Sequence, residues 1–187
     1  MVALILCHVL TRAPIQVKTL GEFRAAIAAA KPGTTILLAP GTYSGGIFLS
    51  DVHGKPNLPI TIGGADRDAP PLIVDAGTGL QLSKVSHLVI RDLVIQRMAN
   101  NGLNIDDGGD VARPSHHVTV QRVSVSQLPS GNHDGIKLSG ITDFSVQDCS
   151  LSRWGGSGID MVGCHRGVWR WLRRARTLRC CKLLRLR

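Results

Sequence analysis

GLQL at residues 79–82, GLNI at 102–105, GIKL at 135–138 and GIDM at 158–161 are copies of one short pattern, and they decide the fold. Their glycines are 23, 33 and 23 positions apart. A second β-type run follows each of the first three copies: HLVIRDLVI (87–95), HVTVQRVSV (117–125) and DFSVQDCSL (143–151). Two turn insertions, of seven and three residues, account for the longer interval and leave the register intact.

A period in the twenties, with two short strands per period and turns that tolerate insertions, is typical of a parallel β-helix. Each coil must bury its apolar face against the others. The alternation predicts the inward residues of the first strand as Leu80, Leu103, Ile136 and Ile159, followed two positions later by Leu82, Ile105, Leu138 and Met161. We therefore predict an all-β, right-handed parallel β-helix. An antiparallel sandwich is the competing fold.

The beginning of the chain adds one helix. TLGEFRAAIAAAKPG has the T-x-x-E spacing of a capping box and an alanine-rich interior, so we predict a helix over about 19–30 that covers the first coil. The apolar run within residues 1–14 resembles a remnant signal segment. We place the β-helix domain at 15–168.

The formal charge of +9 is concentrated at the end of the chain. Residues 166–187 carry nine Lys or Arg and no acid, which leaves 13 basic and 13 acidic residues in the rest. A balanced body that is poor in aromatic residues argues against nucleic-acid binding. From Trp169 the alternation stops, so we interpret 169–187 as a frameshift product. The rival is a genuine cationic tail, in which case the chain would also bind membranes.

A family resemblance rests on AAKPGTTILLAPGTY (29–43), GKPNLPITIGG (54–64) and GLQLSKVSHLVIRDLVIQ (79–96). These segments resemble the pectate-lyase-type right-handed β-helix proteins, closest in layout to the chondroitinase B and alginate lyase group. The resemblance covers roughly 15–165. It implies a secreted or cell-surface protein that acts on acidic polysaccharide, often with calcium.

The catalytic pattern of that group is only partly present. Its lysine base is matched by Lys137, but the paired glutamates are missing, and Asp160 stands where an arginine is expected. The polygalacturonase N-x-D motif resembles Asn132 to Asp134, but its aspartate pair is replaced by Gly-Gly-Ser at 155–157. The fold alone does not fix the reaction.

The repeat itself predicts an outward strip of polar side chains. The residue two after each glycine faces outward, and adjacent coils lie about 4.8 Å apart. The strip collects Gln81, Asn100, Asn104, Asp106, His133, Lys137 and Asp160. Ordinary solvated surface is the competing interpretation, as it is for His116-His117, which we take as a strand start. Cys149 falls at an inward position and is expected to be a core thiol.

The strip suits an anionic sugar polymer. A lyase neutralises a uronate carboxylate and removes the adjacent proton, and Lys137 is the candidate base, with His133 as runner-up. The neighbouring Asp160 stabilises the ammonium form and makes Lys137 a poorer base. Alternatively, Asp134 and Asp160 form the acid/base pair of a hydrolase. Gln81, Asn100 and Asn104 would bind substrate.

The IDDGGD turn offers oxygen ligands for calcium at Asp106, Asp107 and Asp110, although a solvated Asp/Gly turn is the simpler interpretation. We predict a monomeric polysaccharide-active protein, with lyase action favoured. A non-catalytic carbohydrate-binding solenoid and a truncated inactive fragment are the alternatives.

Overall fold

The glycine-led pattern forms the strands of a five-stranded parallel sheet. The computed structural model describes residues 13–170. In chain order this sheet contains β4 (Ile47–Ser50), β7 (Leu80–Ser83), β9 (Leu103–Asp106), β11 (Ile136–Ser139) and β14 (Ile159–Val162). Leu80 pairs with Leu103, Leu103 with Ile136, and Ile136 with Ile159, so the register predicted from the glycines is confirmed.

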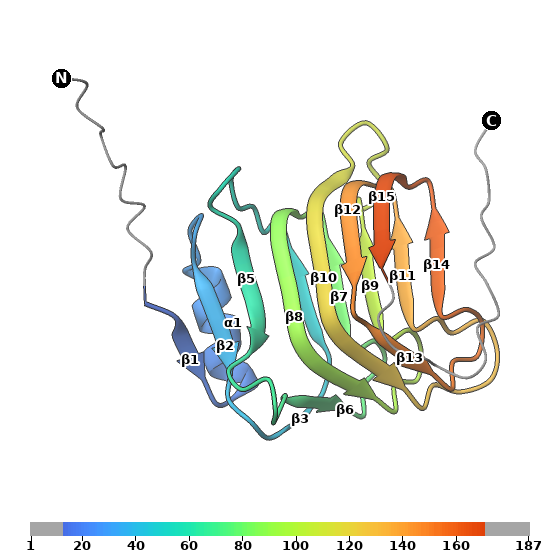
Figure 1. Cartoon of the computed structure of the whole chain (residues 1–187), viewed down its shortest axis with the longest axis horizontal. Coiled ribbons are helices and arrows are strands. Elements are labelled where there is room, and N and C mark those ends of the chain that lie inside the picture. Colours follow the sequence, from blue (N-terminus) through green and yellow to red (C-terminus); the bar gives the residue numbers. More distant parts are fainter. Residues whose placement is uncertain (1–12, 171–187) are drawn as a thin grey trace.

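A ten-stranded parallel sheet forms the remaining faces of the solenoid. Its main path is β1 (Ile15–Val17), β2 (Thr35–Leu38), β5 (Ile60–Gly64), β8 (Ser86–Gln96), β10 (Ser115–Ser126), β12 (Ile141–Gln147) and β15 (His165–Arg170). The short strands β3 (Thr42–Ser44), β6 (Leu72–Val74) and β13 (Ser150–Ser152) pair beside that path. Figure 1 shows the strands stacked side by side from β1 at one end to β14 and β15 at the other.

The long strands β8 and β10 bend so that each serves two faces. The bend falls at Asp92 and Arg122, which have φ values of 56° and 51°, and Asp148 repeats it at 53° after β12. Because Arg91 pairs with Gln121, and Gln121 with Gln147, these left-handed residues lie one above another on successive coils. The same local backbone shape at the same place in each coil keeps the corners aligned.

The core lies inside the coils, where the alternation places it. Leu80, Leu103 and Ile136 are fully buried, and Ile159 is nearly so. Leu82, Ile105 and Leu138 are also buried, whereas Met161 is only partly buried against the same cluster. Facing them are apolar residues of the ten-stranded sheet, namely Leu88, Ile90, Val118, Val120, Phe144 and Val146.

The helix α1 (Leu20–Ala28) lies against β1 and β2 at the first coil, as predicted, and is shorter than the expected 19–30. Thr19 is its N-cap and accepts a hydrogen bond from the Glu22 backbone N–H. Glu22 reaches back to the Lys18 backbone N–H, one residue before the usual capping-box partner. Phe23 is fully buried and anchors the helix to the core.

The last described strand follows the expected alignment. Phe144 pairs with Gly167 and Val146 with Trp169. β15 extends to Arg170, two residues past the domain boundary predicted at 168. The interpretations of the signal segment and of the basic tail concern residues 1–12 and 171–187, which lie outside the described residues. No helix within 13–170 is long and apolar enough to cross a membrane.

Candidate active site

The predicted strip exists as a ladder on the outer face of the five-stranded sheet. Gln81 pairs in register with Asn104, Asn104 with Lys137, and Lys137 with Asp160. All four side chains are partly exposed. The sequence alternation places them outward because their neighbours at positions i ± 1 point into the core. The ladder divides into two groups with different hydrogen-bond partners.

The first group surrounds the ammonium of Lys137. Its Nζ lies 3.0 Å from Asp160 Oδ2 and 3.7 Å from Asp134 Oδ2. The side chains of Lys137 and Asp160 are 28% and 18% exposed, whereas that of Asp134 is 1% exposed. Lys137 and Asp160 are therefore accessible to a ligand, whereas Asp134 is buried and approaches only the ammonium of Lys137.

Asp134 is held by the turns on either side of it. Its backbone N–H donates to Asn101 Oδ1 at 2.8 Å, and its Oδ1 accepts from the Ser157 backbone N–H at 2.8 Å. A Cβ at Gly156 would lie 2.7 Å from that oxygen, so glycine allows the turn to approach. The Gly-Gly-Ser turn that breaks the polygalacturonase pattern thus encloses a buried carboxyl.

The second carboxylate oxygen of Asp134 has no hydrogen-bond donor within the described chain. Burial raises the pKa of Asp134; the Ser157 N–H opposes this rise, and repulsion from Asp160 adds to it. A buried carboxyl with one unsatisfied oxygen and a nearby lysine is typical of a functional site.

The second group consists of amides gathered around Asp106. Its carboxylate accepts from Gln81 Nε2 at 2.6 Å, Asn104 Nδ2 at 3.0 Å and Ser83 Oγ at 2.6 Å. The Gly108 backbone N–H is a fourth donor, at 2.9 Å. Gln81 and Asn104 are therefore oriented by one another and by Asp106, which suits fixed hydrogen bonding to a sugar hydroxyl.

The residues proposed for calcium do not fit a calcium site in this arrangement. Donors surround Asp106, Asp107 accepts from the Gly109 backbone N–H at 2.8 Å, and Asp110 pairs with Arg113 at 2.8 Å. Calcium needs several converging oxygen ligands. Among residues 13–170, the metal-binding side chains that converge in a set of three are histidines elsewhere on the molecule. Calcium binding by this chain stays a prediction.

His133 and Asn100 lie beside the ladder. His133 lines a hollow of about 1120 Å³ together with Arg97 and Arg153, while Lys137 and Asp160 are not among its lining residues. Asn100 is exposed and donates its backbone N–H to Gly77 O at 2.7 Å. Because Asp134 directly follows His133, the hollow adjoins the lysine cluster.

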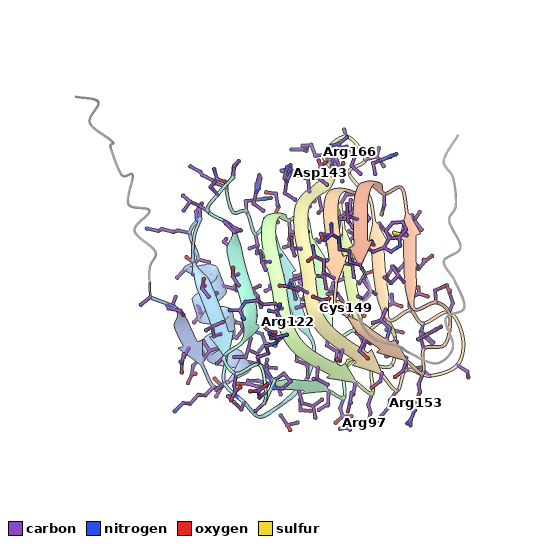
Figure 2. All side chains as sticks on the ribbon, in the orientation of Figure 1. Arg97, Arg122, Asp143, Cys149, Arg153 and Arg166 are labelled. Carbon is purple, nitrogen blue, oxygen red and sulfur yellow. The ribbon has the colours of Figure 1, made fainter. Side chains whose placement is uncertain are left out.

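The two arginines of this hollow were missed at the level of sequence. Figure 2 shows Arg97 and Arg153 projecting from one edge of the solenoid. Arg97 pairs with Asp75 at 2.9 Å, whereas Arg153 forms no ion pair with any residue in 13–170. The repeat does place Arg97 and Arg153 at one position on different coils. Arg97 follows Gln96 and Arg153 follows Ser152, and both Gln96 and Ser152 pair in register with Ser126.

No family model matches the chain, and neither does any curated protein sequence. Solved structures do match it. An alginate lyase from Paenibacillus sp. str. FPU-7 has a TM-score of 0.56 and 18% identity, covering 81% of this chain and 57% of that one. The PL6 family alginate lyase AlyGC and a point mutant of it have the same TM-score and identity, covering 80% of this chain and 26% of theirs.

The fold is a right-handed parallel β-helix. This confirms the fold class and the alginate-lyase layout predicted from the sequence. The chain spans little more than half of the first lyase and about a quarter of the second. At 18% identity the likeness establishes the fold, and the reaction must be argued from the side chains.

Proposed function

We propose that the chain is a lyase-type protein that acts on an acidic, uronate-containing polysaccharide. The observation that carries the proposal is the Lys137 cluster. A partly exposed ammonium is held between Asp160 and Asp134 on the outer face of a fold shared with alginate lyases. The same face presents oriented amides at Gln81 and Asn104.

The charges around the cluster favour an anionic chain. A uronate carboxylate can compete with Asp160 for the Lys137 ammonium, since both side chains are exposed at their ends. Arg97 and Arg153 then lie along the adjoining hollow, where they can contact further carboxylates. Arginine suits this contact because its planar fork binds carboxylate oxygens in pairs.

The elimination requires one proton transfer at the uronate. The base takes the proton next to the carboxylate, the glycosidic C–O bond breaks at the neighbouring carbon, a C=C bond forms, and the departing oxygen acquires a proton. Lys137 acts as the base in its neutral form, after its ammonium has lost a proton to solvent and separated from Asp160. The ammonium that forms when it takes the uronate proton then supplies the proton to the departing oxygen. Asp134 is a positioning residue, because its buried carboxyl cannot touch a substrate. The same burial makes a hydrolase pair of Asp134 and Asp160 less suitable.

A binding role is the second candidate function, and the ion pair between Lys137 and Asp160 favours it. The ammonium of Lys137 lies 3.0 Å from the Asp160 carboxylate, and a cation held in this way can bind the carboxylates of a polymer. A solenoid that only retains acidic polysaccharide needs this charge and no chemistry.

The deciding experiment measures ultraviolet absorbance of unsaturated uronides released from alginate, pectate and chondroitin. We expect release from at least one polymer, and loss of that release in Lys137→Arg. Arginine keeps the positive charge but cannot act as a base. Lys55→Arg, at an exposed lysine away from the strip, is the matched control and should leave release unchanged.

Binding is measured in parallel by retention on columns of the same polymers. Release lost and retention kept in Lys137→Arg supports the lyase with Lys137 as base. Retention without release in the wild type replaces the lyase with the binding solenoid. Since such polymers lie outside cells, we further propose that the protein is exported, which fractionation of the producing cells would test.

A further inference from the structure

Three histidines converge at the edge where β8 and β10 begin, away from the ladder. They are His87 of β8 and His116 and His117 of β10. One ring nitrogen from each lies within 4.8 Å of the others. The Nδ1 atoms of His116 and His117 are 2.9 Å apart. The rings of His87 and His117 stack at 4.5 Å, and His116 meets both edge-on.

The repeat brings these histidines together. His116 pairs with Ser86, so His87 and His117 occupy one position on adjacent coils. Both have left-handed backbone, with φ values of 48° and 55°, so their side chains leave the coils in parallel. Two imidazoles are therefore fixed at the coil spacing, and His116 adds a third from the neighbouring residue.

The surrounding charges are mixed. Burial lowers the pKa of His116, and the neighbouring histidines His117 and His87 lower it further, while Asp143 opposes them. Burial and His117 also lower the pKa of His87. Figure 2 shows Asp143 and Arg166 at this edge, where they pair with each other. A hollow of about 490 Å³ beside His116 is lined by further charged groups, including His53, Lys84, Asp51, Asp110 and Arg113.

We propose that His87, His116 and His117 bind a first-row transition-metal dication of the Zn²⁺ or Ni²⁺ class and so clasp two neighbouring coils. Neutral imidazole nitrogen is the ligand these ions prefer, whereas calcium and magnesium prefer oxygen. Three protein ligands leave the remaining coordination positions to water. The site uses none of the residues assigned to the polysaccharide.

The ring spacing fits such an ion. With metal–nitrogen bonds of about 2.1 Å, two ligands at right angles lie about 3.0 Å apart, and two at tetrahedral angles about 3.4 Å. The Nδ1 atoms of His116 and His117 are already at 2.9 Å. At this distance one ring donates its Nδ1 proton to the other, and a bound metal would require the donor ring to carry that proton on Nε2 instead. His87 offers the third ring nitrogen, which lies within 4.8 Å of the other two, and its ring must turn out of the stack with His117 to reach the ion.

The expected consequence is mechanical coupling of coils. The ion would connect β8 to β10 beyond their backbone hydrogen bonds. It would also fix the end of the turn 107–114, because β10 begins at Ser115 directly after that turn. Binding to the folded chain alone raises its stability.

The test is calorimetric titration of the full chain with Ni²⁺ at neutral pH, together with thermal unfolding at saturating Ni²⁺. His117→Asn and His87→Asn remove one imidazole each while keeping a residue that tolerates left-handed backbone. Each should weaken Ni²⁺ binding by about tenfold or more and reduce the rise in unfolding midpoint accordingly. His165→Asn, an exposed histidine outside the cluster, should behave as wild type.

Equal Ni²⁺ affinity in the wild type and in both variants would overturn the proposal, because the chain also carries histidines and cysteines elsewhere. A midpoint rise of equal size with Ca²⁺ would overturn it as well, since an oxygen-preferring ion does not select imidazole.

Discussion

Two aspartates are buried to almost the same extent but have opposite environments. Asp92 lies in β8 of the ten-stranded sheet, and Asp134 lies just before β11 of the five-stranded sheet. Asp92 is 3% exposed and Asp134 is 1% exposed. Asp92 accepts hydrogen bonds from Arg122 through both oxygens and a further one from Arg91. Asp134 accepts one backbone hydrogen bond and has Lys137 at 3.7 Å.

The pKa values of the two carboxyls move in opposite directions. Burial pushes the pKa of Asp92 upward, but the arginine hydrogen bonds outweigh burial and leave it below its usual value. Burial dominates at Asp134 and raises its pKa. The difference lies in the hydrogen-bond partners: both oxygens of Asp92 have arginine donors, whereas one oxygen of Asp134 has no donor within the described residues.

The largest effect is expected from Asp92→Asn. Removing one partner of a buried ion pair costs about 3–5 kcal/mol, and the partly exposed arginines place this site at the lower end, about 3 kcal/mol. Because the pKa of Asp92 is lowered, its contribution is present above the usual carboxyl pKa of about 3.9 and is lost as the pH falls through the lowered value. Urea unfolding at neutral and acid pH measures both. A loss that persists undiminished in acid would contradict the assigned cause.

A smaller change in stability, with the opposite pH dependence, is expected from Asp134→Asn. Because the pKa of Asp134 is raised, the folded chain gains from its protonated form below the usual carboxyl pKa and loses this gain as the pH rises through the raised value. Asparagine is neutral throughout and keeps the acceptor for Ser157. The variant should therefore become more stable relative to wild type between acid and neutral pH. Urea midpoints that differ by a constant amount would show that the carboxyl does not titrate there.

The smallest loss of stability is expected from Asp75→Asn. This variant tests whether burial or pairing geometry causes the contribution of Asp92 to stability. Asp75 forms the same two-point pair with Arg97, at 2.9 and 3.0 Å, but both side chains are about half exposed. Exposed pairs contribute little because water and salt screen them. The urea midpoint should stay within error of wild type, and a shift approaching that of Asp92→Asn would make pairing geometry the cause.

Much of the fold could be predicted because each copy of the repeat is a short continuous segment that can be recognised in the sequence. Glycine-led openings fixed the strand register, and alternation fixed which of Leu80 and Gln81 points inward. The helix α1 (Leu20–Ala28) lies within the predicted range of about 19–30, and differences of one or two residues at the ends of an element are ordinary.

The arrangement of the candidate site could be predicted only where the strand repeat supplies it. Lys137 and Asp160 share a repeat position, so the ladder was visible, and so was the inward Cys149, whose pKa burial raises to about 11. The enclosure of Asp134 depends on a turn 23 residues later, and the alternation carries no signal for turns. His87 and His117 are the first residues of two aligned runs, and the strand register brings them together.

The parallel stacking also determines how the molecule would respond to force. Each coil is hydrogen-bonded only to its neighbours, so tension along the solenoid axis loads one coil boundary at a time. A coil of 23 residues, the separation of paired Leu80 and Leu103, would release about 75 Å of chain as it peels away. The buried Asp92–Arg122 pair bridges one such boundary, so the coils that it joins would resist separation more than those joined by exposed pairs.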